Sequence, residues 1–199
     1  SSSRGLGDVY KRQANGFDKE ALKILKKRKN LRIINASKVN IDKSISLRSN
    51  FNTLLTQTSD NEFFDNRNFK VVSKAKPSKK IFDNLLFAFN ACRFVKSNAI
   101  VITKDFSTIG IGSGQPSRVD SCEIAVNKMR RFSKDYKNSQ IYAASDAFFP
   151  FVDGIEKLAQ AGVSAIIQPS GSIRDKEIIK FANRLGMILV FSKTRHFRH

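Results

Sequence analysis

The chain has 199 residues, of which 41% are hydrophobic and 10% aromatic, and a formal charge of +19 from 36 lysines and arginines against 17 aspartates and glutamates. This composition excludes an intrinsically disordered protein, the two cysteines are too few for a disulfide framework or a structural zinc site, and no apolar run approaches the roughly 20 residues that cross a bilayer. We therefore expect a folded cytoplasmic protein without a membrane partner.

The first thirteen residues, SSSRGLGDVYKRQ, differ from the rest because they are rich in serine and show no apolar period. Their end, DVYKRQ, looks like the translated end sequence of a sequencing transposase. We expect residues 1–13 to be a cloning or assembly artefact and residues 14–199 to be the part that folds.

The next third of the chain predicts short elements. A helix is expected from Phe17 to Lys29, because acidic side chains open it and lysines close it. Short strands are expected at 31–35, 50–58 and 70–74. A long helix from about Ser78 to Val95 would place four apolar side chains on one face: Ile81, Leu85, Phe89 and Cys92.

The second half of the chain alternates regularly between apolar runs and helical patterns. Strands are expected at 98–104, 108–114, 141–145, 164–168 and 187–191. Helices are expected at 117–136, 153–161 and 175–185. Such alternation indicates a layered α/β fold with a largely buried sheet, in which binding sites form where strand ends meet helix starts.

The loop GIGSGQPSR, from Gly110 to Arg118, has two interpretations. Its glycines, the helix start at Ser117 and the guanidinium of Arg118 could together bind an anion. Alternatively it is a turn before a helix that Ser117 caps. A second loop, QPSGSIRD, favours a plain turn in which Ser172 starts the next helix and Asp175 stabilises it. Neither loop matches a Walker A or Rossmann motif.

The two histidines, His196 and His199, are expected to be solvated because they lie near the chain end. A zinc-deaminase signature, H-x-E with P-C-x-x-C, is absent from the sequence, so no zinc is expected.

Nucleic acid is disfavoured as a partner, because the basic residues are spread along the chain and most are lysines. A basic nucleic-acid-binding module and a non-catalytic oligomerisation domain remain the alternative functions. The positive charge could attract an anionic ligand or reflect an AT-rich coding sequence, and both explanations stay open.

Five motifs in series carry a family resemblance: KSNAI, IGIGSGQPSRVDS, ASDAFFPFVDGIE, AIIQPSGSIRD and RHFRH. In this order they resemble the C-terminal part of the bifunctional purine-biosynthesis family that joins aminoimidazolecarboxamide ribotide (AICAR) formyltransferase to IMP cyclohydrolase. The resemblance implies a cytidine-deaminase-like αβα fold with a mixed sheet and without zinc. It also implies a homodimer and formyl transfer from 10-formyltetrahydrofolate to AICAR.

The resemblance assigns roles to single residues. Four would bind the ribotide: Asn98, Arg118, Phe148 and Arg195. Pro150 and Asp153 would lie on the folate side. Ser97 and Asp146 match positions at which some relatives hold potassium.

The phenylalanines of SDAFFPFVDG would then form an apolar floor for the flat pterin and imidazole, with Phe149 or Phe151 turned inward. In the family, a Lys-His pair in a K-H-x-N/S-P segment carries out the proton transfer. This sequence does not contain such a segment. We also expect the cyclohydrolase domain and the first part of the transformylase domain to be absent from it. We expect the 199 residues to be inactive alone.

Overall fold

The structure is a computed structural model that describes residues 11–38, 45–60, 68–133 and 140–198. Residues 1–10 of the expected artefact, and His199, lie outside the described residues. Contacts divide the chain into two units, residues 1–61 and 62–199. Among the described residues, no helix has the length and apolar character that a membrane crossing requires.

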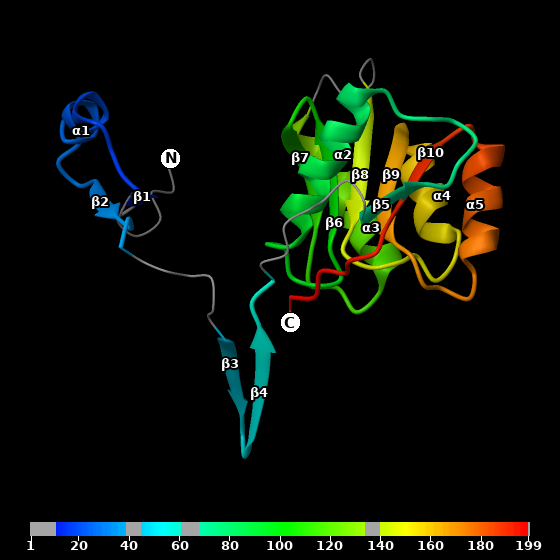
Figure 1. Cartoon of the computed structure of the whole chain (residues 1–199), viewed down its shortest axis with the longest axis horizontal. Helices are drawn as coiled ribbons and strands as arrows, with labels where there is room; N and C mark the ends of the chain where they lie inside the picture. The colour runs from blue at the N-terminus through cyan, green and yellow to red at the C-terminus, as the bar shows by residue number, and fades with distance from the viewer. Residues whose placement is uncertain (1–10, 39–44, 61–67, 134–139, 199) are drawn as a thin grey trace. The chain divides into compact units, whose positions relative to one another are not determined.

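The first unit contains two small two-stranded sheets (Figure 1). Strand β1 (Lys11–Ala14) pairs in parallel with β2 (Arg32–Asn35), and α1 (Lys19–Leu25) lies between them in the chain. The helix begins where the Asp18 carboxylate accepts a hydrogen bond of 2.6 Å from the Ala21 N–H. Three residues of the expected artefact, 11–13, therefore take part in a strand.

A β-hairpin follows, made of β3 (Ile45–Asn50) and β4 (Thr53–Thr58). The sequence predicted a single strand at 50–58, which is wrong at its start because residues 51 and 52 form the turn. All six residues of β3 are exposed, and its two apolar residues, Ile45 and Leu47, form only a short alternating pattern.

The second unit is built on a six-stranded sheet in the order β5-β10-β9-β8-β6-β7 (Figure 1). Its strands are β5 (Phe69–Val71), β6 (Ile100–Lys104), β7 (Ser107–Gly112), β8 (Ile141–Ser145), β9 (Val163–Pro169) and β10 (Ile188–Ser192). Strands β8, β9 and β10 run parallel, whereas β6 is antiparallel to β7 and β8, and β5 is antiparallel to β10. The mixed α/β sheet expected for this chain is confirmed.

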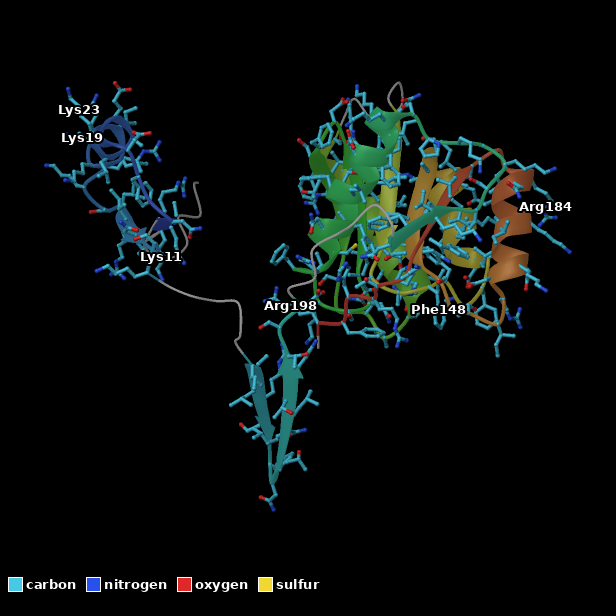
Figure 2. All side chains as sticks on the ribbon, viewed as in Figure 1. Lys11, Lys19, Lys23, Phe148, Arg184 and Arg198 are labelled. Carbon is cyan, nitrogen blue, oxygen red and sulfur yellow. The ribbon has the colours of Figure 1, made fainter. Side chains whose placement is uncertain are left out.

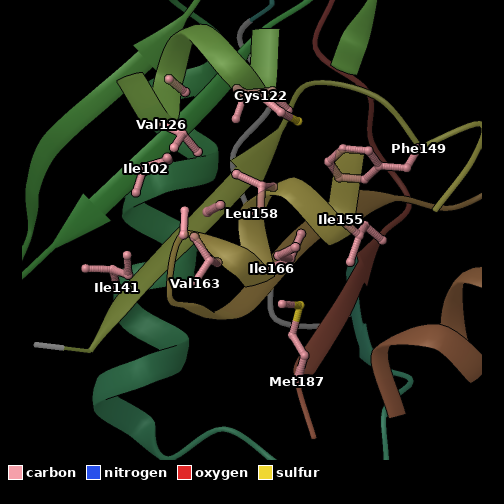
Figure 3. Close-up of a cluster of buried hydrophobic side chains, with 14 of the residues drawn as sticks. Ile102, Cys122, Val126, Ile141, Phe149, Ile155, Leu158, Val163, Ile166 and Met187 are labelled. Carbon is pink, nitrogen blue, oxygen red and sulfur yellow. The ribbon is translucent and has the colours of Figure 1, made fainter. Parts of the chain in front are cut away.

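Helices cover both faces of this sheet. Helix α2 (Lys79–Cys92) packs on one face through Leu85 and Phe89, as its apolar stripe predicted. Three helices share the other face: α3 (Arg118–Phe132), α4 (Asp153–Gln160) and α5 (Asp175–Arg184). Figure 3 shows the apolar cluster beneath them, in which Leu158 and Ile166 are fully buried. The layered αβα arrangement follows from these two cores.

Several predicted element ends need correction. Helix α3 ends at Phe132, short of the predicted position 136, and residues 134–139 lie outside the described residues. Helix α5 begins at Asp175, as the predicted range 175–185 has it, and not at Ser172. The Asp175 carboxylate accepts hydrogen bonds from the N–H groups of Gly171 and Ser172, so it stabilises the turn that leads into the helix.

Two glycines of the GIGSGQPSR loop serve close packing. A Cβ atom at Gly112 would collide with the Ser121 carbonyl oxygen, and one at Gly110 with the carbonyl oxygen of Ala125. Both clashes are with helix α3, so the glycines let this helix lie directly on β7. Ser117 stands at the N-cap position, but its side chain makes no capping hydrogen bond, which corrects the predicted cap.

A tight turn joins β6 to β7. Asp105 and Phe106 both have positive φ angles, 44° and 56°, which side-chain-bearing residues seldom adopt. Asn84 of helix α2 stabilises the turn, because its fully buried amide oxygen accepts a hydrogen bond of 2.9 Å from the Phe106 N–H. The turn is thus tied to a helix on the face of the sheet.

Candidate functional site

A cleft of about 460 Å³ lies in the second unit, where the end of β8, the start of α3 and the C-terminal segment meet. It is lined by all six residues predicted to bind the two substrates: Asn98, Arg118, Phe148, Pro150, Asp153 and Arg195. These residues come from four segments that are distant in sequence. Figure 2 shows Phe148 at this end of the sheet, and Arg184 projecting from α5 away from it.

The sheet register explains the convergence. Because β6 is antiparallel to β8, the start of β6 lies beside the end of β8, with Ile100 opposite Ser145. The C-terminal segment then folds back over this corner. His196 N–H donates to the Asp146 carbonyl oxygen at 2.9 Å, and the Arg198 N–H donates to the Ser97 hydroxyl at 3.1 Å. Arg195 is thereby carried to the cleft.

The Arg118 guanidinium is held by three side chains. Its Nη1 donates to the Asp146 carboxylate at 2.5 Å and to the Ser145 hydroxyl at 2.9 Å. Its Nη2 donates to the Asn98 amide oxygen at 2.8 Å. The Arg118 side chain is 8% exposed and that of Asp146 is fully buried, so this ion pair is largely shielded from water.

The orientation of the Asn98 amide follows from its partners. Its Nδ2 donates to the carbonyl oxygens of Gln115 and Pro116, at 2.9 and 3.1 Å. A carbonyl can only accept, so the nitrogen must face these two groups and the oxygen must face Arg118. The peptide bond before Asn98 is cis.

The three phenylalanines of the SDAFFPFVDG segment point in different directions. Phe149 is 1% exposed and belongs to the core, which confirms that one of the predicted pair turns inward. Phe148 is half-buried in the cleft wall, and Phe151 is 50% exposed at its rim. The Arg174 guanidinium lies 4.5 Å from the Phe151 ring centroid, a cation–π contact. Of the three rings expected to form an apolar floor, those of Phe148 and Phe151 are accessible and that of Phe149 belongs to the core.

Sequence reasoning missed two polar residues that shape this loop. The buried Gln168 accepts a hydrogen bond from the Phe149 N–H at 3.2 Å, and the Ser145 hydroxyl donates to the Ala147 carbonyl oxygen at 2.7 Å. Both are uncharged residues at the ends of buried strands. A polar residue within an otherwise apolar strand pattern is the feature of the sequence that could have identified them. They fix the main chain on either side of Phe148.

His196 was expected to be solvated, and that expectation is wrong. It is 1% exposed, and its ring centroid lies 4.4 Å from that of Phe89 on helix α2. The ring is therefore part of the packing that holds the C-terminal segment on the sheet.

The two positions suggested for potassium offer poor ligands. One Asp146 carboxylate oxygen already binds Arg118, and the Ser97 hydroxyl accepts from the Arg198 N–H. A guanidinium against the carboxylate also neutralises the charge that would attract a cation. Among the described residues, no three His, Cys, Asp or Glu side chains are grouped to hold a metal.

The two cysteines are buried and free of disulfides. Burial raises the pKa of the Cys122 thiol from its ordinary value of 9.0 to about 12, with Arg118 opposing the shift. Burial also raises the pKa of Cys92, and the negative charge of Asp146 adds to this effect. Thiols of this kind stay protonated at neutral pH and are poor nucleophiles.

A larger cavity of about 660 Å³ lies between helices α4 and α5. Its lining includes Phe181, Met187 and Arg184, and none of the residues predicted to bind substrate. The predicted site is therefore not at this cavity but at the cleft beside the end of β8.

Comparison with known proteins supplies the family relationship. The model of the AICARFT/IMPCHase bienzyme family matches residues 13–128. The bifunctional purine biosynthesis protein PurH of Leptospira biflexa is 46% identical over 188 residues, and that of Oenococcus oeni is 44% identical over 187 residues. Each match covers 94% of this chain, which spans 36% of the length of these relatives.

Among solved structures, a dCMP deaminase from the cyanophage S-TIM5 matches 57% of this chain and 98% of its own. It is 18% identical, with a TM-score of 0.37.

Proposed function

The chain belongs to the AICARFT/IMPCHase bienzyme family, and from this premise we propose that its cleft binds the ribotide and folate substrates of a formyltransferase. The observation that carries the proposal is the convergence of the six predicted residues on a single cleft. Four separate segments contribute to it, so their meeting is a consequence of the fold and not of sequence proximity.

On the ribotide side we assign Asn98, Arg118, Phe148 and Arg195. The Arg118 and Asn98 side chains are fixed by hydrogen bonds, which suits them to orient a planar carboxamide and its ring. Arg195 is exposed at the cleft and is available to an anionic group.

On the folate side we assign Pro150 and Asp153, with the exposed ring of Phe151 beside them. A flat pterin would lie against the apolar side chains, and the Asp153 carboxylate would accept hydrogen bonds from its N–H groups. Asp153 opens helix α4 and is exposed, so its carboxylate is accessible to a ligand.

The reaction would transfer the formyl group of 10-formyltetrahydrofolate to the exocyclic amine of the ribotide. The amine nitrogen attacks the formyl carbon and loses a proton, a tetrahedral oxyanion forms, and the bond to the folate nitrogen breaks as that nitrogen gains a proton. In this proposal the cleft binds and orients both partners. The proton-transfer pair lies outside these 199 residues, and the chain is inactive alone.

We extend the proposal to the longer protein. Residues 14–199 form the C-terminal part of its transformylase domain, the protein is a cytoplasmic homodimer, and IMP cyclohydrolase activity resides in a separate domain. The two free buried thiols support a reducing compartment. No step is assigned to potassium, because the Arg118 guanidinium neutralises the Asp146 carboxylate and the Ser97 hydroxyl accepts from the Arg198 N–H.

Isothermal titration of the 199-residue chain with AICAR and with a folate analogue tests the proposal. We expect each ligand to bind with a stoichiometry of one per chain, and a formyl-transfer assay to show no turnover. Tight, steeply salt-dependent binding of an oligonucleotide, with no response to AICAR, would instead support a nucleic-acid-binding module. Binding of none of the three ligands would favour an oligomerisation domain.

A further inference from the structure

Asp146 lies at the point where the walls of the cleft meet. Its N–H donates to the Ala99 carbonyl oxygen at 3.2 Å, in the segment after Asn98. Its own carbonyl oxygen accepts from the His196 N–H at 2.9 Å, in the C-terminal segment. Its carboxylate reaches the third wall at Arg118. A single residue therefore connects the segment after Asn98, the start of helix α3 and the C-terminal segment.

The Asp146 carboxylate lies in an environment that is unfavourable for a charged group. It is fully buried, and its second oxygen, Oδ2, has no hydrogen-bond partner among the described residues. A buried acceptor without a partner costs free energy, and a buried ion pair is seldom better for stability than well-packed apolar residues. Stability alone is a poor explanation for a carboxylate at this position.

The hydrogen-bond donors of Arg118 are only partly engaged by the protein. A guanidinium has five N–H groups. Asp146 and Ser145 engage both protons of Nη1, and Asn98 engages one proton of Nη2. The Nε proton and one Nη2 proton remain on a side chain that lines the cleft. Because the other three donors are engaged, the guanidinium cannot rotate, and the remaining two keep one direction.

We propose that Asp146 is a positioning residue, which orients the Arg118 guanidinium and, through it, the Asn98 amide before any ligand binds. This inference rests on the proposed function for the statement that Arg118 and Asn98 contact the ribotide. It assigns Asp146 to the arginine and not to a monovalent cation. Ordering these side chains in advance lowers the entropy that binding must overcome.

The free chain provides the first test. In ¹⁵N–¹H spectra at low temperature, a guanidinium held on both nitrogens gives separate Nη1 and Nη2 signals, whereas a freely rotating one gives an averaged signal. We expect separate signals for Arg118 without ligand, identified by their loss in Arg118→Lys. An averaged Arg118 signal in the free chain overturns the proposal, whatever the variants do.

Asp146→Asn provides the second test, because it keeps the shape and one acceptor oxygen but removes the charge. We expect the Arg118 signals to average and the affinity for AICAR to fall at least tenfold. Asp105→Asn is the matched control, since it makes the same change of charge at an exposed carboxylate in the turn between β6 and β7, where Asp105 pairs with Lys80. It should keep the separate signals and lose less than threefold in affinity. Circular dichroism and thermal melting establish that each variant is folded.

The outcomes separate the two proposals. If the free chain gives separate Arg118 signals that average in Asp146→Asn, but AICAR does not bind, Asp146 orients the arginine and the proposed function fails. If AICAR binds and Asp146→Asn leaves the signals separate and the affinity within twofold, the positioning role fails. Loss of a potassium response in Asp146→Asn with the Arg118 signals unchanged would make Asp146 a cation ligand and would overturn the proposal.

Discussion

Arg195 and Arg184 form a matched pair, because each is an exposed arginine whose guanidinium lies over a phenylalanine ring. The distances are 5.3 Å from Phe197 for Arg195 and 5.1 Å from Phe181 for Arg184. Only Arg195 lines the cleft. The two residues therefore share a local environment and differ in their proposed role.

Arg195→Ala should weaken AICAR binding by roughly ten- to a hundredfold, as expected for the loss of a charge-assisted hydrogen bond of about 1.5–3 kcal/mol. Arg184→Ala should leave binding within twofold, although it removes the same charge from the same unit. Calorimetric titration at two salt concentrations measures both. Equal losses in the two variants would mean that Arg195 contributes only its charge to the overall field of the protein.

The Cys122 thiol makes stability depend on pH in the alkaline range. Its pKa is raised from 9.0 to about 12 in the folded chain. The unfolded chain therefore binds fewer protons than the folded one between these values, and the free energy of unfolding falls as pH rises. Cys122 alone contributes a slope of about 1.4 kcal/mol per pH unit between these two values. Urea denaturation at pH 8 and pH 10.5 measures it, with Cys122→Ala as the variant in which this contribution disappears.

At the level of elements, the contact of helix α3 with strand β7 sets the position of Arg118. The helix begins at Arg118, three residues before the Ser121 carbonyl that touches Gly112. A displacement of the helix from the strand would therefore move the guanidinium relative to Asp146.

Gly112→Ala should destabilise the second unit and also abolish AICAR binding, because the new methyl group can be accommodated only if the helix moves away. Overpacking of this kind costs about 1–3 kcal/mol. Gly114→Ala is the control: its φ of +69° makes alanine strained by about 1–2 kcal/mol, but no atom lies closer than 3.7 Å to the new Cβ. Gly114→Ala should retain binding, and thermal melting with calorimetry separates the two effects. Full binding by Gly112→Ala would show that the helix start does not depend on this contact.

The elements of the second unit were predictable because most of them carry a strong apolar pattern. Strands β6 and β8 have nearly continuous buried runs, and the stripe of α2 recurs at helical spacing. Strand β3 has no buried side chain and was not predicted. Its two apolar residues, Ile45 and Leu47, alternate over three positions only, and such a short run does not distinguish a strand from a loop.

The residues that line the candidate cleft could be named from the sequence, but the contacts that support them could not. The motifs identified Asn98 and Arg118, yet local sequence gave no sign that Asp146 binds Arg118, because 28 positions separate the two. The burial of His196 depends on Phe89, a residue of helix α2 far earlier in the chain. The packing role of Gly112 likewise requires the approach of a helix that the loop itself does not specify.

At the level of the whole molecule, the two units differ in how much apolar surface they bury. In the described part of the first unit, one hydrophobic residue, Ala36, is buried. The hairpin exposes apolar side chains such as those of Leu47 and Leu54, each of which has a relative exposure of 61%. The second unit has apolar cores on both faces of its sheet. Resistance to local opening depends on such burial.

We expect hydrogen exchange to divide the chain accordingly. Amides of β6, β8 and β9 should exchange through global unfolding, whereas those of β3 and β4 should exchange within seconds. Mass spectrometry of peptides after timed labelling measures both. Protection of the hairpin comparable to that of β8 would mean that another surface covers its apolar side chains in solution, and the concentration dependence of that protection would reveal self-association.

The turn at Asp105 and Phe106 has a consequence for redesigning the chain. The side-chain amide oxygen of Asn84, on α2, accepts its hydrogen bond from the Phe106 N–H, so new termini created by circular permutation at this turn would leave a buried acceptor without a partner. Within the described ranges, the turn between β3 and β4, where Phe51 is fully exposed, has no such hydrogen bond to a helix and is the better place for the chain to be opened.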